Sequence, residues 1–426
     1  MTAASLARAA ARRGLLGAQS LGRRRWLRVL GPAWVVMLAD VDAPSVLTAA
    51  KAGTEFGDAL LLPLVALIPI LYLVKEMTAR LGIVTGRGHA ELLRERYGFG
   101  WAAVAVISMA AIDLLAYVAE FAGIVLGAGI LGVPAWLAVV FALVFHSLMV
   151  LTGGYRRYER IALLLSIALF TFVVLAFKTH PDADAVLGGL SLAQPLGSRP
   201  YLDLVVATVG AVVMPWMLFY QQAATVDKGL GIEDLPAART ETLVGAIASE
   251  LLMAAVVVAT AAAMAGPARG LGASVGALPA GLARLATGFP AVLIAVGMVG
   301  AGLLAAVVIS LSSAWAWSEL FRWPHSLNLS LRRAPGFYAL YLLEVVPAAL
   351  VALLAQNLIT VIIDAMILNV VVLAIPLAFL VRMSGDRAIL GPLANGPVRS
   401  AICWVVTGGL LAMGLWSALG TFGILR

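Results

Sequence analysis

Two aspartates and a proline interrupt the first long apolar segment of the chain, in the run Asp40-Val41-Asp42-Ala43-Pro44-Ser45. A carboxylate at the centre of a bilayer is costly unless it has a partner, and a cation is the most direct one. Asp42, the Ser45 hydroxyl and a backbone carbonyl freed by Pro44 would offer a cation hard oxygen ligands. The alternative is that Asp42 only caps a half-helix.

The sixth apolar segment is interrupted in the same way, by Met214-Pro215-Trp216. Met214 on this segment would add a soft thioether sulfur to the oxygen ligands of the first. Thioether sulfur binds hard cations poorly, so this mixture favours Mn²⁺, Fe²⁺, Co²⁺ or Cd²⁺ over Ca²⁺ or Mg²⁺. The alternative is that Met214 faces lipid, but the matching positions of the two prolines favour a metal site.

Other polar residues within apolar segments have more than one interpretation. Asp113 and Glu120 are seven residues apart and share one helix face, where they could relay protons or meet a lysine or water. His146 could bind a metal, carry a proton or hydrogen-bond to a neighbouring carbonyl. Asn369 would face a cavity if the tenth segment packs beside the first. Acidic residues also lie in or near later segments, at Glu250, Glu344 and Asp364.

The elements that hold these residues are membrane-spanning helices. Of the 426 residues, 62% are hydrophobic and 12% are charged, and a mean hydropathy of +1.01 excludes a soluble globular protein. A spanning helix needs about 20 mostly apolar residues, because lipid offers the backbone no hydrogen-bond partner. We expect an all-α polytopic protein of about eleven spans, near 30–51, 57–79, 100–130, 134–152, 159–178, 201–226, 240–266, 289–318, 336–354, 358–382 and 398–422.

The positions of the basic residues predict the orientation of the chain. With the N-terminus inside, 23 of the 29 Lys and Arg residues fall on the cytoplasmic side, seven of them in the basic tail 1–29. This asymmetry is typical of a multi-pass plasma-membrane protein with a cytoplasmic N-terminus. The net charge of +7 therefore reports topology, and we expect no nucleic-acid partner. A signal or transit peptide is the alternative for the tail, but no small-residue cleavage site follows it.

The broken first and sixth spans also predict the domain organisation. An inverted repeat of five plus five helices places such breaks at corresponding positions, facing each other near the midplane of the membrane. We expect one transmembrane domain over 30–426, with repeat one over about 30–178, repeat two over about 201–382 and an additional helix over about 398–422.

No motif of a soluble enzyme has the context it needs. Gly127-Ala128-Gly129-Ile130-Leu131-Gly132 matches a dinucleotide fingerprint by letter, but no strand precedes it and no acidic residue follows at the expected distance. The single cysteine, Cys403, can form neither an internal disulfide nor a thiol pair for a metal. We expect the protein not to be an enzyme and to hold no cofactor.

Over nearly all its spans the chain resembles the NRAMP family of divalent metal-ion transporters, as a divergent member. The motifs that carry the resemblance are Asp42-Ala43-Pro44-Ser45, Ala52-Gly53-Thr54-Glu55-Phe56-Gly57, the run from Ala79 to Gly86, the run from Glu91 to Tyr97, Gly154-Tyr155-Arg156-Arg157 and Ala211-Val212-Val213-Met214-Pro215. The resemblance implies a LeuT-like fold in which the Met214 sulfur and the Ala211 carbonyl face the ion opposite Asp42.

The chain departs from the family motif at residues that the family uses for binding and proton movement. Ser45 replaces an asparagine, Trp216 a histidine and Tyr117 an aspartate, whereas Glu120 still matches. These departures argue against family-type proton coupling, although protons stay a possible coupled ion. The additional carboxylate of Asp40 favours a harder ion such as Mg²⁺, whereas the retained methionine favours a transition metal.

We therefore expect alternating-access transport of a divalent transition-metal cation of the Mn²⁺/Fe²⁺ class. The metal ion is the expected substrate, and membrane lipid is the other expected partner of the protein. The expected metal ligands are Asp42, Ser45, Ala211 and Met214. The accessory or coupling candidates are Asp40, Glu120, Tyr117, Trp216 and Asn369. The alternatives are a Mg²⁺ transporter of the same family, a cation-coupled organic-solute transporter of the same fold, a channel and an intramembrane enzyme.

Overall fold

The computed structural model describes residues 29–151, 153–265, 279–354 and 358–421, and within these ranges the chain is helical without strands. The predicted tail 1–29 thus lies almost wholly outside the described residues. Nine stretches are long and apolar enough to cross a membrane; the first of them contains two consecutive spans, and a shorter apolar helix adds one more. The described residues therefore form the eleven spans expected from the sequence.

The first span is broken where the sequence places its aspartates. It consists of α3 (Pro32–Ala39) and α4 (Ala43–Phe56), joined by an irregular segment over 40–42. Pro44 stands in the first turn of α4, where a missing backbone N–H costs nothing because that group has no partner within the helix. The break predicted for this span is confirmed.

The sixth span has the matching interruption. Helix α12 (Arg199–Val212) ends before an extended pair of residues, and α13 (Pro215–Asp227) begins at the proline. Here the proline occupies the first helical position. At both breaks, backbone groups lose the partners that a continuous helix would give them, and at membrane depth such groups are tolerated only inside the protein.

The remaining spans are continuous helices or helix pairs with a short irregular joint. They are α5 (Leu61–Thr85), α7 (Phe99–Ile130), α8 (Ala135–Leu151), α9 (Tyr155–Ala168) with α10 (Thr171–Lys178), α14 (Leu235–Met264), α16 (Gly288–Phe321), α17 (Pro335–Leu343) with α18 (Val345–Leu354), α19 (Leu358–Gly385) and α21 (Pro397–Thr421). Short helices lie between spans: η1 (Gly57–Leu60), α6 (His89–Tyr97), α11 (Ala183–Gly189), η2 (Ile232–Asp234), α15 (Ala280–Leu285), α20 (Arg387–Leu390) and η3 (Gly391–Leu393).

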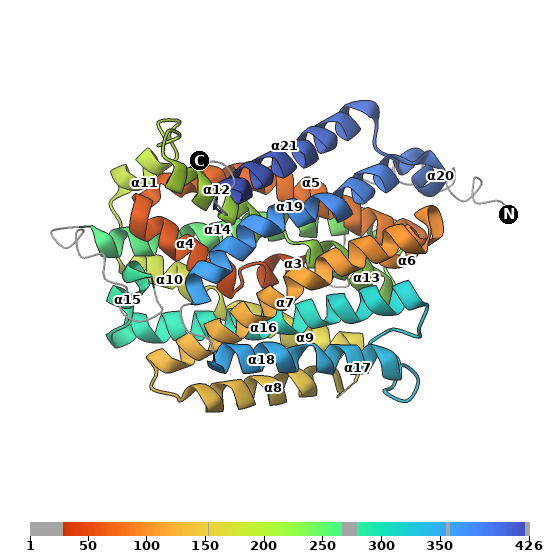
Figure 1. Cartoon of the computed structure of the whole chain (residues 1–426), viewed down its shortest axis with the longest axis horizontal. Coiled ribbons are helices and arrows are strands. Elements are labelled where there is room, and N and C mark those ends of the chain that lie inside the picture. Colours follow the sequence, from red (N-terminus) through yellow and green to blue (C-terminus); the bar gives the residue numbers. More distant parts are fainter. Residues whose placement is uncertain (1–28, 152, 266–278, 355–357, 422–426) are drawn as a thin grey trace.

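The broken spans lie in the interior of the bundle. Figure 1 shows α3, α4 and α13 between an edge formed by α19 and α21 and an opposite edge formed by α8, α17 and α18. Helix α14 packs along α3 and α4, and α7 packs along α16. Large apolar side chains such as Trp136, Phe141 and Leu164 are exposed on the outer helices, as expected for a surface that faces lipid.

Glycines allow the closest of these helix approaches. A Cβ atom at Gly53 of α4 would lie 2.3 Å from the Val257 carbonyl oxygen of α14. On α16, a Cβ at Gly302 would lie 2.8 Å from the Glu120 carbonyl oxygen of α7. Small residues at helix interfaces bring backbones together in this way in membrane proteins. They fix the positions of α4 and α7, which carry the polar residues of the site.

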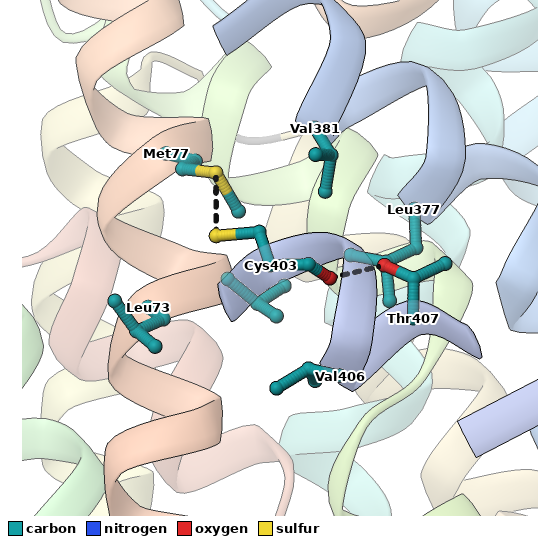
Figure 2. A pocket seen from close by; sticks show the side chains of 8 residues that line it. Leu73, Met77, Leu377, Val381, Cys403, Val406 and Thr407 are labelled. Carbon is teal, nitrogen blue, oxygen red and sulfur yellow. Dashed lines mark hydrogen bonds between the residues drawn. The ribbon is translucent and has the colours of Figure 1, made fainter. Parts of the chain in front are cut away.

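The single cysteine is packed against a neighbouring helix. The Cys403 thiol on α21 lies 3.8 Å from the Met77 sulfur on α5 (Figure 2). The small pocket there is apolar in character, with lining residues Leu73, Val74, Met77, Leu377, Val381, Cys403, Val406 and Thr407. None of these lining residues has a carboxylate that could bind a metal ion.

Candidate functional site

Asp42 stands at the start of the second half of the first span. Its Oδ1 accepts a hydrogen bond of 2.8 Å from the backbone N–H of Ser45, so the carboxylate caps α4. Its Oδ2 is buried and has no hydrogen-bond partner among the residues that the structure describes. The side chain is therefore both a cap and a buried carboxylate with one oxygen free to bind a ligand, so the two interpretations of Asp42 are compatible.

Ser45 joins the two broken helices. Its hydroxyl donates a hydrogen bond of 3.2 Å to the backbone carbonyl of Ala211, in the last turn of α12. Carbonyls in the last turn of a helix have no intrahelical donor and carry the negative end of the helix dipole, which favours a cation. The structure thus brings together three of the four predicted ligands, Asp42, Ser45 and Ala211.

Met214, the fourth predicted ligand, lies in the break of the sixth span. Its backbone is extended, with φ −106° and ψ 146°, and it precedes the first residue of α13. The indole Nε1 of Trp216 donates to its sulfur over 3.1 Å. The Trp216 carbonyl in turn accepts a hydrogen bond of 2.7 Å from Ser312 on α16. Met214 is fully buried, so the alternative that it faces lipid is wrong.

Asn369 of α19 holds the freed backbone of the sixth span. Its amide Nδ2 donates to the Gly210 carbonyl at 2.6 Å and lies 3.4 Å from the Val213 carbonyl. Its Oδ1 is buried, and no described residue hydrogen-bonds to it. Gly210 allows this approach, because a Cβ there would lie 1.9 Å from the Met366 carbonyl oxygen. Asn369 therefore lies beside the predicted site, bonded to the break itself.

Glu120 of α7 completes the surroundings of Asp42. Its Oε2 accepts a hydrogen bond of 3.1 Å from the backbone N–H of Ala43, and its carboxyl group is adjacent to that of Asp42. Its Oε1 has no partner within the described part of the chain. Glu120 is thus a neighbour of the predicted ligand and not of Asp113, with which it shares a helix face.

A second polar cluster lies about one turn along α7 from Glu120. Tyr117 donates a hydrogen bond of 3.4 Å to Glu344, which also accepts one of 2.7 Å from Ser313. Asp113 is buried within electrostatic range of Glu344. The sequence analysis named Glu344 without a role, because nothing in the sequence indicates that the ninth span packs against the third. Tyr117 belongs to this cluster and does not contact the predicted ligands.

His146 is a hydrogen-bonded interior residue. Its Nε2 lies 2.8 Å from the Ser310 hydroxyl, and its ring stacks on Tyr341 with 4.2 Å between centroids. Of the interpretations given above, hydrogen bonding to a neighbour is the one observed, with a hydroxyl in place of a carbonyl.

Asp40 lies in the break of the first span, two residues before Asp42. It is buried, and it interacts electrostatically with Asp42, with Glu250 of α14 and with Lys75 of α5. Lys75 lies within the predicted span 57–79. Helix α5 continues to Thr85, so Lys75 is fully buried within it.

Ion pairs centred on the buried Glu76 link three helices at one end of the bundle. Glu76 of α5 pairs with Arg80 at 3.2 Å, with Arg239 of α14 at 2.8 Å and with Arg399 of α21. Nearby, Lys228 pairs with Glu159 at 2.7 Å. Asp42, Ser45, Ala211 and Met214 are fully buried, so the site is closed to both ends in this structure.

The donor set suits reversible binding of a metal ion as substrate. It contains one carboxylate, one hydroxyl, one carbonyl and one thioether. Among the residues described, no group of three or more His, Cys, Asp or Glu side chains could hold a metal permanently. A site with few charged ligands, built at two helix breaks, is what alternating-access transporters present to a cation.

Comparison with known proteins gives consistent results. The family model described as "Natural resistance-associated macrophage protein-like", Nramp, matches residues 33–419. The "Divalent metal cation transporter MntH" of Ralstonia nicotianae is 31% identical over 416 residues, which cover 92% of this chain and 91% of that protein. The protein of the same name from Bacillus subtilis is 26% identical over 422 residues, 94% of each chain.

Solved structures show the same fold. The manganese transporter of Eremococcus coleocola matches with a TM-score of 0.75 at 18% identity, covering 95% of this chain and 90% of that chain. Mhp1, a transporter of the nucleobase-cation-symport-1 family, matches with a TM-score of 0.55 at 14% identity, covering 91% and 89%. The LeuT-like fold with broken first and sixth helices is thus confirmed.

Proposed function

The chain belongs to the Nramp family of membrane transporters, which are not enzymes, and on this premise we propose that it carries a divalent transition-metal cation across the bilayer by alternating access. The observation that carries the proposal is the hydrogen bond between Ser45 and Ala211, which joins the two helix breaks beside the free oxygen of Asp42. The relatives that are named divalent metal cation transporters support it.

The ion binds between the two broken helices. Asp42 offsets its charge, the Ser45 hydroxyl and the Ala211 carbonyl complete its oxygen ligands, and the Met214 sulfur selects softer ions. To take these places the ion displaces the Ser45–Ala211 hydrogen bond and orders both oxygens around itself. Asn369 keeps the break of the sixth span in shape while this occurs.

Mn²⁺ or Fe²⁺ is the preferred class of substrate. The retained thioether favours these ions over Mg²⁺, because Mg²⁺ accepts oxygen ligands and keeps much of its water. The name of the Eremococcus coleocola protein, a manganese transporter, agrees with this choice. Mg²⁺ is the second candidate, and Asp40 is the residue that favours it, since an additional buried carboxylate suits a harder ion.

Transport follows from movement of the helices around the fixed site. The two repeats, over about 30–178 and 201–382, rock against each other and expose the ion first to one side and then to the other. The closed end with Glu76 and its arginines faces the cytoplasm, as the basic residues of the chain indicate. The N-terminus is on the same side, and the membrane is the plasma membrane.

Transport is not coupled to protons in the manner of the family motif. Trp216 stands where that motif has a histidine, and its indole does not titrate in the physiological range. Tyr117 stands where it has an aspartate, and the Tyr117 hydroxyl bonds to Glu344. The two residues that carry protons in the family motif are therefore both replaced here, so they do not form a proton path from the ion site to the cluster of Tyr117 and Glu344.

Uptake into proteoliposomes tests the proposal. Purified protein is compared with Asp42→Ala and Met214→Ala in parallel uptake of Mn²⁺ and Mg²⁺, with a pH dye inside the vesicles. We expect the wild type to take up Mn²⁺ saturably without a change in the dye signal. Asp42→Ala should abolish this uptake, and Met214→Ala should shift the preference of the transporter from Mn²⁺ toward Mg²⁺. Transport of neither ion, or normal transport by Asp42→Ala, would overturn the metal site; Mg²⁺ uptake without Mn²⁺ uptake would support the second candidate.

A further inference from the structure

Three arginines converge on one carboxylate at the end of the bundle. Glu76 Oε1 pairs with Arg80 at 3.2 Å and with Arg239 at 2.8 Å, and Glu76 Oε2 pairs with Arg399. Among the residues that the structure describes, these arginines form ion pairs with no other acidic side chain. Guanidinium groups keep their proton, so the Glu76 cluster, formed by these four residues, has an excess of two positive charges.

Two of the three arginines can reach a ligand outside the protein. Arg80 is engaged within the bundle, where it donates to the Leu393 carbonyl and, over 2.6 Å, to Asn395 Oδ1. The side chains of Arg239 and Arg399 are instead 38% and 31% exposed. The Nε of Arg399 is buried and has no hydrogen-bond partner in the described part of the chain. The excess charge and the unpaired donor both call for an anion.

The apolar pocket shown in Figure 2 lies one helical turn from these arginines. Cys403, which lines it, follows Arg399 by four residues on α21, and Met77 precedes Arg80 by three residues on α5. Residues at these spacings share a helix face. Asn395 contacts both sides, because its Nδ2 lies 3.3 Å from the Met77 sulfur and its Oδ1 accepts from Arg80. The charged cluster and the pocket therefore adjoin each other.

The pocket lies at the outer surface of the bundle. Leu73 of α5 and Val406 of α21 line it and are only half-buried. Helix α21 forms an edge of the bundle (Figure 1), and Val405, the residue before Val406, is 74% exposed. Lipid chains surround this surface in a membrane, so they can reach the pocket while a head group lies at the arginines.

We propose that the Glu76 cluster and the adjoining pocket bind an anionic phospholipid. Its phosphate lies on Arg239 and Arg399, and an acyl chain enters the pocket between Leu73 and Val406. Arginine binds phosphate through paired N–H donors, and basic pockets between membrane helices take anionic head groups. A free phosphate ion would satisfy the arginines but leave the apolar pocket without a ligand, so the combination favours a lipid. The inference goes beyond the proposed function and does not depend on metal binding.

Lipid retention by the purified, metal-free protein tests this site. Native mass spectrometry measures the binding of phosphatidylglycerol and, as the uncharged comparison, of phosphatidylcholine. We expect phosphatidylglycerol to bind about tenfold more tightly or better. Arg239→Gln and Arg399→Gln should each weaken its binding about fivefold. The double variant should show no preference between the lipids, and it keeps the Arg80–Glu76 pair, so that the buried carboxylate retains a partner.

The pocket has its own pair of variants. Val406→Phe fills the space between α5 and α21 but leaves every arginine in place, so it should weaken phosphatidylglycerol binding. Val405→Phe adds the same bulk to the neighbouring exposed position and should leave binding unchanged. Equal binding by Val406→Phe and the wild type would overturn the placement of the acyl chain.

A control for charge comes from the same end of the molecule. Arg96→Gln removes a basic residue that pairs with Asp386 outside the cluster, and it should retain phosphatidylglycerol like the wild type. Size-exclusion profiles and melting temperatures in phosphatidylcholine report the folding of each variant. No preference for phosphatidylglycerol in the wild type, or an unchanged preference in the folded double variant, would overturn the site.

Inorganic phosphate and glycerol 3-phosphate distinguish a lipid from a free phosphate. In lipid-free protein, millimolar amounts of either should raise the melting temperature less than phosphatidylglycerol does. Equal stabilisation that disappears in the double variant would make a soluble phosphate the ligand and overturn the lipid assignment. Because no metal is present in these measurements, their outcome is independent of whether the protein transports Mn²⁺.

Discussion

The indole Nε1 of Trp216 donates a hydrogen bond to the sulfur of Met214, with 3.1 Å between the two atoms. A thioether sulfur is a weak acceptor, and the bond engages one of its lone pairs and fixes its direction. A metal ion must use the other lone pair or displace the indole. The proposed sulfur ligand is thus restrained by Trp216, which stands where the family resemblance implies a histidine.

Trp216→Phe should therefore raise the affinity for soft ions. Phenylalanine keeps an aromatic ring in the buried position but cannot donate, so both sulfur lone pairs become available. We expect Cd²⁺ and Mn²⁺ to bind about three- to tenfold more tightly, a gain equivalent to one weak hydrogen bond, with Mg²⁺ affinity unchanged. Calorimetry with the three ions measures the effect.

Met214→Ala provides the control for that prediction. Without the sulfur, Trp216→Phe should no longer change Cd²⁺ affinity. An equal gain in both backgrounds would show that the indole acts on the ion by some route other than the thioether.

Asn369→Leu should destabilise the break of the sixth span. The substitution keeps the approximate size of the side chain but removes the donor to the Gly210 and Val213 carbonyls. Buried carbonyls that lose their partner cost about 1–3 kcal/mol. Melting of the detergent-solubilised variant should therefore occur several degrees below that of the wild type.

Leu368→Ala is the matched control for Asn369→Leu. Leu368 is the preceding residue of α19 and is 36% exposed on the outer surface, so its truncation should lower the melting temperature less. Equal losses for the two variants would mean that the hydrogen bonds of Asn369 contribute no special stability.

The helix breaks could be predicted from local sequence because their cause is local. Proline cannot continue a helix from the preceding turn, and Asp42 is a good cap for the helix that starts after it. The contact between Ser45 and Ala211 joins residues far apart in the chain, so only the family resemblance could indicate it. The partners of Tyr117 and Asn369 are equally distant in sequence, and no local pattern indicates them.

Lys75 shows where reasoning from charge alone fails. Basic residues at the end of an apolar segment usually mark a cytoplasmic loop, and Lys75 and Arg80 follow such a segment. Both are instead buried, because α5 extends to Thr85 and Arg80 pairs with Glu76 one turn earlier on the same helix. The sequence contains Glu76 but not the information that Arg239 of α14 and Arg399 of α21 also converge on it.

His89 gives the protein a pH-dependent stability. It lies on the short helix α6, outside the spans, with its Nδ1 2.9 Å from the Gln222 Oε1. The Gln222 amide donates to the Arg87 carbonyl, which orients its Oε1 to accept from the neutral histidine. Burial lowers the pKa of His89 to about 4 from its usual value of about 6.5.

The sign of the effect follows from these pKa values. Between pH 6.5 and 4 the unfolded chain binds a proton at His89 that the folded protein does not, so the free energy of unfolding falls as the pH falls. The full loss, reached below pH 4, is about 3 kcal/mol, and the residue has no effect above pH 6.5. Melting temperatures from pH 7.5 to 4.5 should show this decline.

His89→Gln should make that decline shallower, because glutamine does not titrate, even if the variant is less stable at neutral pH. The same slope in wild type and His89→Gln would assign the pH dependence to other groups.

Glu76→Gln should open the closed end of the bundle, and the single cysteine can report it. Glu76 holds Arg80, Arg239 and Arg399, and so ties α5 to α14 and α21. Removing the carboxylate leaves three guanidinium groups facing one another, a loss of several kcal/mol for a buried partner. Cys403 lies on α21 four residues after Arg399 and is only 3% exposed, so maleimide should label it slowly in the wild type.

In Glu76→Gln we expect the labelling rate of Cys403 to rise at least about tenfold in folded protein, since α21 is then less firmly held against α5. Arg96→Gln is the matched control: it breaks the Arg96–Asp386 pair, which is largely exposed and contributes little stability. Because the chain has one cysteine, no other thiol contributes to the signal. If both variants label at the wild-type rate while circular dichroism and size-exclusion profiles are unchanged, the ion pairs of Glu76 do not keep this end closed.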